Sequence, residues 1–100
     1  MTDTTSCNSI EEVRRNVDRI DIQIVSLLEE RGRYVKQAAR FKKTTDDVKA
    51  PQRVEEVIDK VKAMSLQVGA NAVVVERVYR AMISAFVEAE LTEHALLHSE

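Results

Sequence analysis

Residues 10–43 read IEEVRRNVDRIDIQIVSLLEERGRYVKQAARFKK, and this stretch decides the fold. Its apolar residues recur mostly at spacings of three and four, the period of one face of an α-helix; they are Ile10, Val13, Val17, Ile20, Ile24, Leu27, Leu28, Val35 and Ala38. Ser9 followed by Glu12 matches the capping box that opens a helix. Gly32 is the one glycine in the stretch and costs about 1 kcal/mol relative to alanine. The pattern predicts a single helix over residues 10–43.

Two further helices are expected after a loop. The run TTDDVKA at residues 44–50 lacks the helical pattern and predicts the loop. Pro51 suits the first turn of a second helix, and Gly69 is typical of a helix end. Asn71 is expected to cap a third helix, which continues past Leu91 to a short polar end. The apolar stripes of the two helices are Val54, Val57, Ile58, Val61 and Met64, and then Val74, Val75, Val78, Met82, Ile83, Phe86 and Val87.

The composition favours an all-α protein. With 100 residues, two Gly, one Pro and four aromatic residues, the chain has little material for turns or sheet. We expect one domain over residues 1–100, with a flexible segment at 1–8. A net charge of −2 argues against a nucleic-acid binder. No apolar run approaches the length of a membrane span, and the N-terminus lacks the features of a signal peptide, so we expect a cytoplasmic protein.

The first helix is too long for the rest of one chain to surround. At 1.5 Å per residue it measures about 50 Å, whereas a compact domain of this size is only about 35 Å across. The apolar face therefore needs a partner. We expect a two-fold homodimer, the commonest symmetric assembly.

Three cations lie close to the apolar line of this helix. Arg31 and Lys42 are eleven residues apart, which places them within about 20° of each other and about 16 Å apart on one helix. This spacing suits one small anion between them. Arg14 lies about 25 Å from Arg31 along the axis, so it could reach such a ligand only across an antiparallel dimer. The alternative is that the cations cover apolar surface with their stems or pair with Glu29 and Glu30.

The run VRRNVDRIDIQIVSLLEERGRYVKQAARFK at residues 13–42 resembles the all-helical chorismate mutase family. YVKQAARFK and APQRV at residues 50–54 are most similar to its branch that contains the isochorismate pyruvate lyase of salicylate and siderophore synthesis. The resemblance covers nearly the whole chain. It implies a three-helix protomer in an intertwined homodimer, with no metal and no cofactor.

The resemblance also implies a site for a dicarboxylate, chorismate or isochorismate. Arg14 from the partner and Arg31 would bind the two carboxylates through paired, charge-assisted hydrogen bonds. Lys42 would donate to the ether oxygen, and Arg53 would add positive charge to the lining. Glu90 is the fifth residue that the resemblance places in this site. The implied reaction is the pericyclic rearrangement of chorismate to prephenate, with pyruvate elimination from isochorismate as the alternative.

Two positions depart from the family pattern. Glu90 stands where many members carry Gln, and an ionised carboxylate cannot donate a hydrogen bond. We therefore expect Glu90 to be protonated in the working enzyme. At position 54 the mutases often carry an acid that meets the ring hydroxyl. Val54 is apolar instead, as in the lyase branch. The position that distinguishes chorismate from isochorismate is therefore not specified.

Two other interpretations stay open. The chain could be a helical module that dimerises or binds a partner helix without catalysis. It could also be an inactive relative that binds the dicarboxylate without converting it. His94 and His98 lie four residues apart, but no carboxylate or cysteine set completes a metal site. We interpret both histidines as surface residues.

Overall fold

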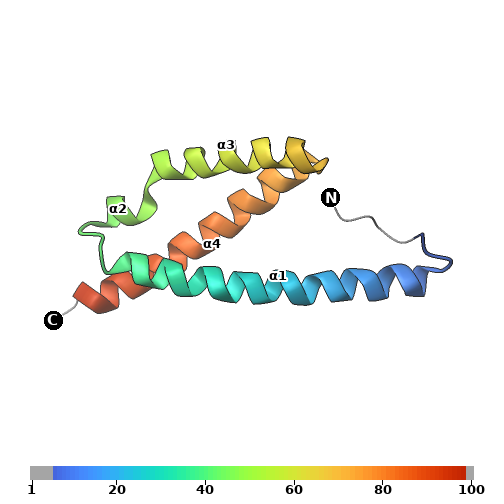
Figure 1. Ribbon diagram of the computed structural model, residues 1–100. Helices are drawn as coiled ribbons and strands as arrows, with labels where there is room; N and C mark the ends of the chain where they lie inside the picture. The colour runs from blue at the N-terminus through green and yellow to red at the C-terminus, as the bar shows by residue number, and fades with distance from the viewer. Residues whose placement is uncertain (1–5, 99–100) are drawn as a thin grey trace. The chain divides into compact units, whose positions relative to one another are not determined.

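The structure, a computed structural model, describes residues 6–98 and is all-α (Figure 1). Its helices are α1 (Ile10–Ala39), α2 (Thr45–Lys49), α3 (Pro51–Val68) and α4 (Ala72–His98). The all-α class and three long helices are confirmed, and residues 6–98 contain no strand. Most of the N-terminal segment expected to be flexible, residues 1–5, lies outside the described residues. The chain divides into two units, Met1–Tyr34 and Val35–Glu100, and α1 runs through the boundary.

The start of α1 agrees with the capping prediction, and its end does not. The Ser9 hydroxyl accepts a hydrogen bond from the Glu12 amide at 3.2 Å. The Glu12 carboxylate reaches back to the amide of Asn8, at 3.0 Å. After Ala39 the amides of residues 40–42 bond to carbonyls three residues earlier instead of four, which tightens and ends the helix. The predicted continuation to residue 43 is wrong.

The predicted loop at 44–50 contains a short helix, so that prediction is also wrong. The Thr44 hydroxyl accepts from the Asp47 amide at 3.1 Å, and the Asp47 carboxylate accepts from the Thr44 amide at 3.2 Å. This reciprocal capping box opens α2, and burial of Val48 secures it. Ala50 has a left-handed backbone, with φ of 37°, which turns the chain into α3 at Pro51.

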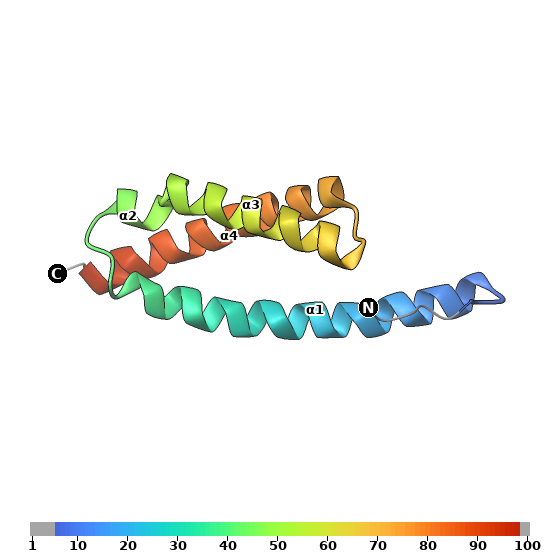
Figure 2. The same ribbon diagram turned by 45° about the horizontal axis from the view of Figure 1, so that its top comes forward.

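In the second unit, α3 and α4 lie side by side as a hairpin, and α2 also packs on α4 (Figures 1 and 2). Gly69, with φ of 73°, ends α3 as predicted. The Asn71 side chain accepts hydrogen bonds from the amides of Val73 and Val74, which confirms it as the cap of α4. The buried apolar side chains are Ala39, Val48, Ile58, Val61 and Ile83.

The first unit has no core of its own. No residue from 6 to 34 is buried, and most of the predicted apolar line of α1 is exposed: Ile10, Val13, Val17, Ile20, Ile24 and Leu27. Exposed apolar residues arranged along one helix face are typical of an interaction surface. Among residues 6–98, no helix combines the length and the apolar character that a membrane crossing requires.

Candidate active site

The second unit holds a largely buried ion pair between Lys42 and Glu90. Lys42 Nζ lies 2.7 Å from Glu90 Oε2, and the two side chains are 27% and 6% exposed. Glu90 lies on α4, seven residues after the buried Ile83 and therefore on the same face of that helix. Of the five predicted site residues, the structure brings these two together.

The pair leaves hydrogen-bonding capacity unused. Glu90 Oε2 is buried, and no hydrogen bond within residues 6–98 satisfies it. The ammonium of Lys42, 2.7 Å away, is its ion-pair partner. Buried polar atoms are nearly always hydrogen-bonded, and an unsatisfied one is costly. This oxygen can therefore accept a hydrogen bond from a further donor, or, in the acid form of Glu90, donate one to an acceptor.

Lys42 does not lie on α1, so its predicted helical spacing from Arg31 does not apply. Instead, three contacts hold its backbone just beyond the helix. The Lys42 amide donates to the Ala39 carbonyl at 3.4 Å. The Lys42 carbonyl oxygen lies 2.8 Å from His94 Nε2. The next amide, of Lys43, donates to the Asp47 carboxylate at 3.1 Å. The chain is thus secured on both sides of the lysine side chain.

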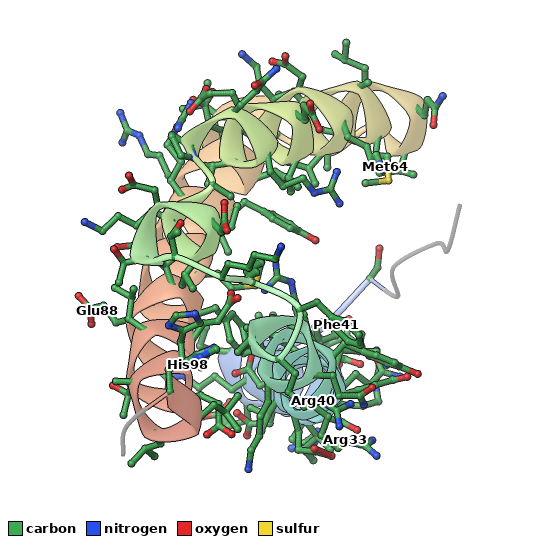
Figure 3. The ribbon with its side chains drawn as sticks, turned by 90° about the vertical axis from the view of Figure 1, so that its left-hand side faces the viewer. Arg33, Arg40, Phe41, Met64, Glu88 and His98 are labelled. Carbon is green, nitrogen blue, oxygen red and sulfur yellow. The ribbon has the colours of Figure 1, made fainter. Side chains whose placement is uncertain are left out.

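His94 is buried, with 6% of its surface exposed, so its interpretation as a surface residue is wrong. It lies one helical turn after Glu90 and shares its face of α4. That spacing, continued from Ile83, is the sequence signal that could have revealed it. Its ring contacts the ring of the exposed His98, with centroids 4.2 Å apart, on the last turn of α4 (Figure 3). No group of three metal-ligating side chains occurs in the described part of the chain.

Asp47 stabilises the turn that follows Lys42. Its carboxylate accepts hydrogen bonds from the amides of Lys43 and Thr44. These bonds lower the pKa of Asp47 below its ordinary value of 3.8, and the bond from the Lys43 amide has the largest effect. The ionised form is therefore the one that fixes this turn.

The three predicted arginines are divided between the two units. Arg14 is exposed and Arg31 is half-buried, both on the part of α1 that belongs to the first unit. Arg53 lies in the first turn of α3, exposed and 3.7 Å from Glu56. Glu29 pairs with Arg33 at 2.8 Å. The substrate-binding roles of the three arginines stay predictions.

A second charged cluster links α3 to α4. The Arg80 guanidinium donates two hydrogen bonds to the Glu55 carboxylate, at 2.9 and 3.0 Å, and one to Glu76 at 2.9 Å. These bonds raise the pKa of Arg80, and the bonds to Glu55 have the largest effect. They also lower the pKa values of both glutamates. Lys62 adds a contact of 3.5 Å to Glu76. Arg80 thus bonds to one carboxylate on α3 and one on α4, which suits a structural link.

An apolar cleft lies where α3 turns into α4. No charged residue lines it, so it does not suit a dicarboxylate. Met64, labelled on α3 in Figure 3, belongs to its wall. The lining residues are Val61, Met64, Ser65, Val68, Ala70, Val75 and Tyr79.

Comparison with known proteins identifies the family of this chain. The family model for chorismate mutase type II matches residues 13–91. An isochorismate pyruvate lyase from Pseudomonas aeruginosa is 31% identical over 85 residues, which cover 85% of this chain and 84% of that protein. A bifunctional chorismate mutase/prephenate dehydratase from Aquifex aeolicus is also 31% identical, over 81% of this chain and 24% of that protein. The chain belongs to the chorismate mutase type II family.

Proposed function

We propose that this protein is a chorismate mutase, which rearranges chorismate to prephenate. The observation that carries the proposal is the buried Lys42–Glu90 pair with its unsatisfied oxygen, in a chain of this family. The reaction breaks the ether C–O bond and forms a C–C bond within one molecule. It therefore requires no nucleophile and no external group, only a folded substrate and charge placed at the ether oxygen.

Lys42 and Glu90 act on the breaking bond. The ammonium of Lys42 donates to the ether oxygen, where negative charge grows in the transition state. Glu90 joins it as a protonated acid, since only the acid form can donate. Protonation of Glu90 also removes its charge attraction for Lys42, which leaves the ammonium for the substrate.

The arginines bind the two carboxylates of the substrate. Arg31 supplies one fork from the same chain, and Arg14 supplies the other from a second copy. Arg53 adds positive charge to the lining. The exposed apolar face of α1 supports a homodimer, because a helix of 30 residues with no buried residue before position 35 gains most by packing on another copy.

Isochorismate pyruvate lyase is the second candidate. The match to a lyase of nearly the same length and the apolar Val54 next to Arg53 favour it. In that reaction a ring hydrogen moves to the enolpyruvyl group as the C–O bond breaks. Pyruvate leaves and the ring becomes aromatic as salicylate. The same cations would serve, because the same ether oxygen gains charge.

Product analysis separates the two reactions. Purified protein is mixed with chorismate and, separately, with isochorismate, and the products are identified by proton NMR. Prephenate from chorismate supports the mutase. Salicylate and pyruvate from isochorismate, with little prephenate, make the lyase the main function. If neither substrate reacts, the enzyme assignment is wrong, and a binding module or an inactive relative remains.

The shared site has its own test, in which two inactive variants are mixed. Arg14→Leu and Lys42→Met subunits are combined, unfolded and refolded together. If Arg14 serves its partner's site, each mixed dimer has one intact site, and about a quarter of the wild-type activity returns, as random two-fold pairing requires. If Arg14 serves its own chain, no mixed dimer has an intact site and no activity returns.

A further inference from the structure

The Lys42 amide bonds to Ala39 at the end of α1, but the Lys42 carbonyl oxygen needs an anchor that α1 does not provide. Lys42 lies three residues beyond the end of α1, in a segment without regular structure. Its carbonyl oxygen therefore has no partner from the helical ladder. A lysine on such a segment can move its ammonium over several ångströms through backbone rotation alone. Catalysis at one ether oxygen requires the opposite, a fixed position.

His94 provides this anchor from α4. A carbonyl oxygen can only accept, so the 2.8 Å contact assigns the hydrogen to Nε2 of His94. The imidazole is 6% exposed, so water competes little for this bond. Glu90 lies one turn earlier on the same helix face and contacts the ammonium of the same lysine. One face of α4 thus holds Lys42 at both its carbonyl and its side-chain end.

We propose that His94 is a positioning residue for catalysis: its Nε2–H hydrogen bond to the Lys42 carbonyl fixes the ammonium beside Glu90. His94 itself does not touch the substrate. The inference rests on the proposed function, because it assigns catalytic work to Lys42. It holds for the mutase and for the lyase, since both use the same ammonium.

Matched variants isolate the hydrogen bond. His94→Leu keeps a similar apolar volume and removes the donor. His94→Gln keeps an amide donor close to the position of Nε2. His94→Asn carries the same amide on a shorter side chain that does not reach. His98→Leu removes the contacting ring without touching Lys42, and it controls for ring packing.

The first readout requires no substrate. In protein labelled with ¹³C, the Lys42 carbonyl resonance reports its hydrogen bond. We expect it to move upfield in His94→Leu and His94→Asn and to stay near the wild-type position in His94→Gln and His98→Leu. A resonance that is unmoved in His94→Leu would overturn the proposal. This measurement gives its result even if the protein converts neither substrate. The anchoring hydrogen bond would then stand, while the proposed function and the catalytic purpose of the bond would fail.

The second readout is the separation of kcat from KM, with whichever substrate the wild type converts. A displacement of about 1 Å at a catalytic group can cost about 100-fold in rate. We expect kcat to fall by about 10- to 100-fold in His94→Leu, with a much smaller change in KM. His94→Gln should recover most of the loss, and His98→Leu should behave as wild type.

A double variant distinguishes positioning from general support of the fold. If His94 acts through Lys42, then adding His94→Leu to Lys42→Met causes little further loss of kcat. If the two losses of kcat multiply in the double variant, the proposal is contradicted. An equal fall of kcat in His94→Leu and His94→Gln would also contradict it. If His94→Leu fails to fold by circular dichroism, the comparison of His94→Asn with His94→Gln decides.

Discussion

Two charged clusters of the second unit differ in how fully they are satisfied. Around Arg80, well-aligned hydrogen bonds of 2.9 to 3.0 Å link an exposed guanidinium to two glutamates. Around Lys42, the ammonium lies closer to its carboxylate, at 2.7 Å, yet no hydrogen bond within residues 6–98 satisfies Glu90 Oε2. The side chains of Lys42 and Glu90 are also less exposed than those of Arg80 and Glu55.

The difference indicates which cluster serves the fold and which serves a ligand. Exposed ion pairs add little to stability and tolerate replacement, and the Arg80 guanidinium already donates three hydrogen bonds to carboxylates. A buried charge pair is costly unless its hydrogen bonds are complete. The incomplete bonding at Glu90 supports our proposal that its partner comes from the substrate. The following predictions test this contrast.

The largest effect is expected at Lys42. Lys42→Met should lower kcat by about 100-fold or more, as loss of a donor to a developing oxyanion does. Arg80→Met, the same change in the other cluster, should leave kcat within about twofold, because most surface changes act weakly. Steady-state kinetics with circular dichroism as a folding control checks both. Equal losses in the two variants would contradict the contrast.

The next effect concerns the pH profile. If Glu90 works as an acid, activity falls as rising pH removes its proton. Glu90→Gln donates at every pH, so its kcat should stay nearly level from acid to neutral conditions. Rate measurements over that range in wild type and variant check this. An unchanged profile in the variant would remove Glu90 from the mechanism.

The smallest effect is on acid stability, and it belongs to the Arg80 cluster. Arg80 lowers the pKa values of Glu55 and Glu76 below their ordinary value of 4.5. Groups with lowered pKa values stabilise the folded state above the ordinary value, and that stabilisation is lost as pH falls through the lowered values. Arg80→Met should therefore lower the Tm slightly at pH 7. The difference from wild type should vanish in strong acid, as thermal unfolding followed by circular dichroism will show.

Periodicity and caps made most of the fold predictable from sequence. Three long helices, the cap at Asn71 and the stop at Gly69 follow from local rules that tertiary packing did not override. The sequence pattern does not predict the short helix α2, because TTDD has the composition of a polar loop. Its Thr44 and Asp47 in fact form a capping box, and burial of Val48 secures the turn. The end of α1 at Ala39 was missed because residues 40–43 still favour helix.

The site was only partly predictable. Helical spacing placed Lys42 wrongly, and resemblance to the family, rather than periodicity, singled out Glu90. The spacing of Ile83, Glu90 and His94 on α4 could have revealed the burial of His94. Its contact with the Lys42 carbonyl depends on packing against the segment beyond α1, which no local pattern encodes. The proposed role of Arg14 depends on a second copy, and the sequence of one chain defines its own helix faces but not their partner.

The most direct test of the central claim is a carboxylate-detected NMR titration with chorismate. Glutamate side chains are labelled with ¹³C at the δ position, and Glu90→Gln assigns the Glu90 resonance. We predict that chorismate moves the Glu90 resonance and leaves those of Glu55 and Glu76 in place. An unmoved Glu90 resonance, or equal movement at Glu55, would show that the buried pair is not where the substrate binds.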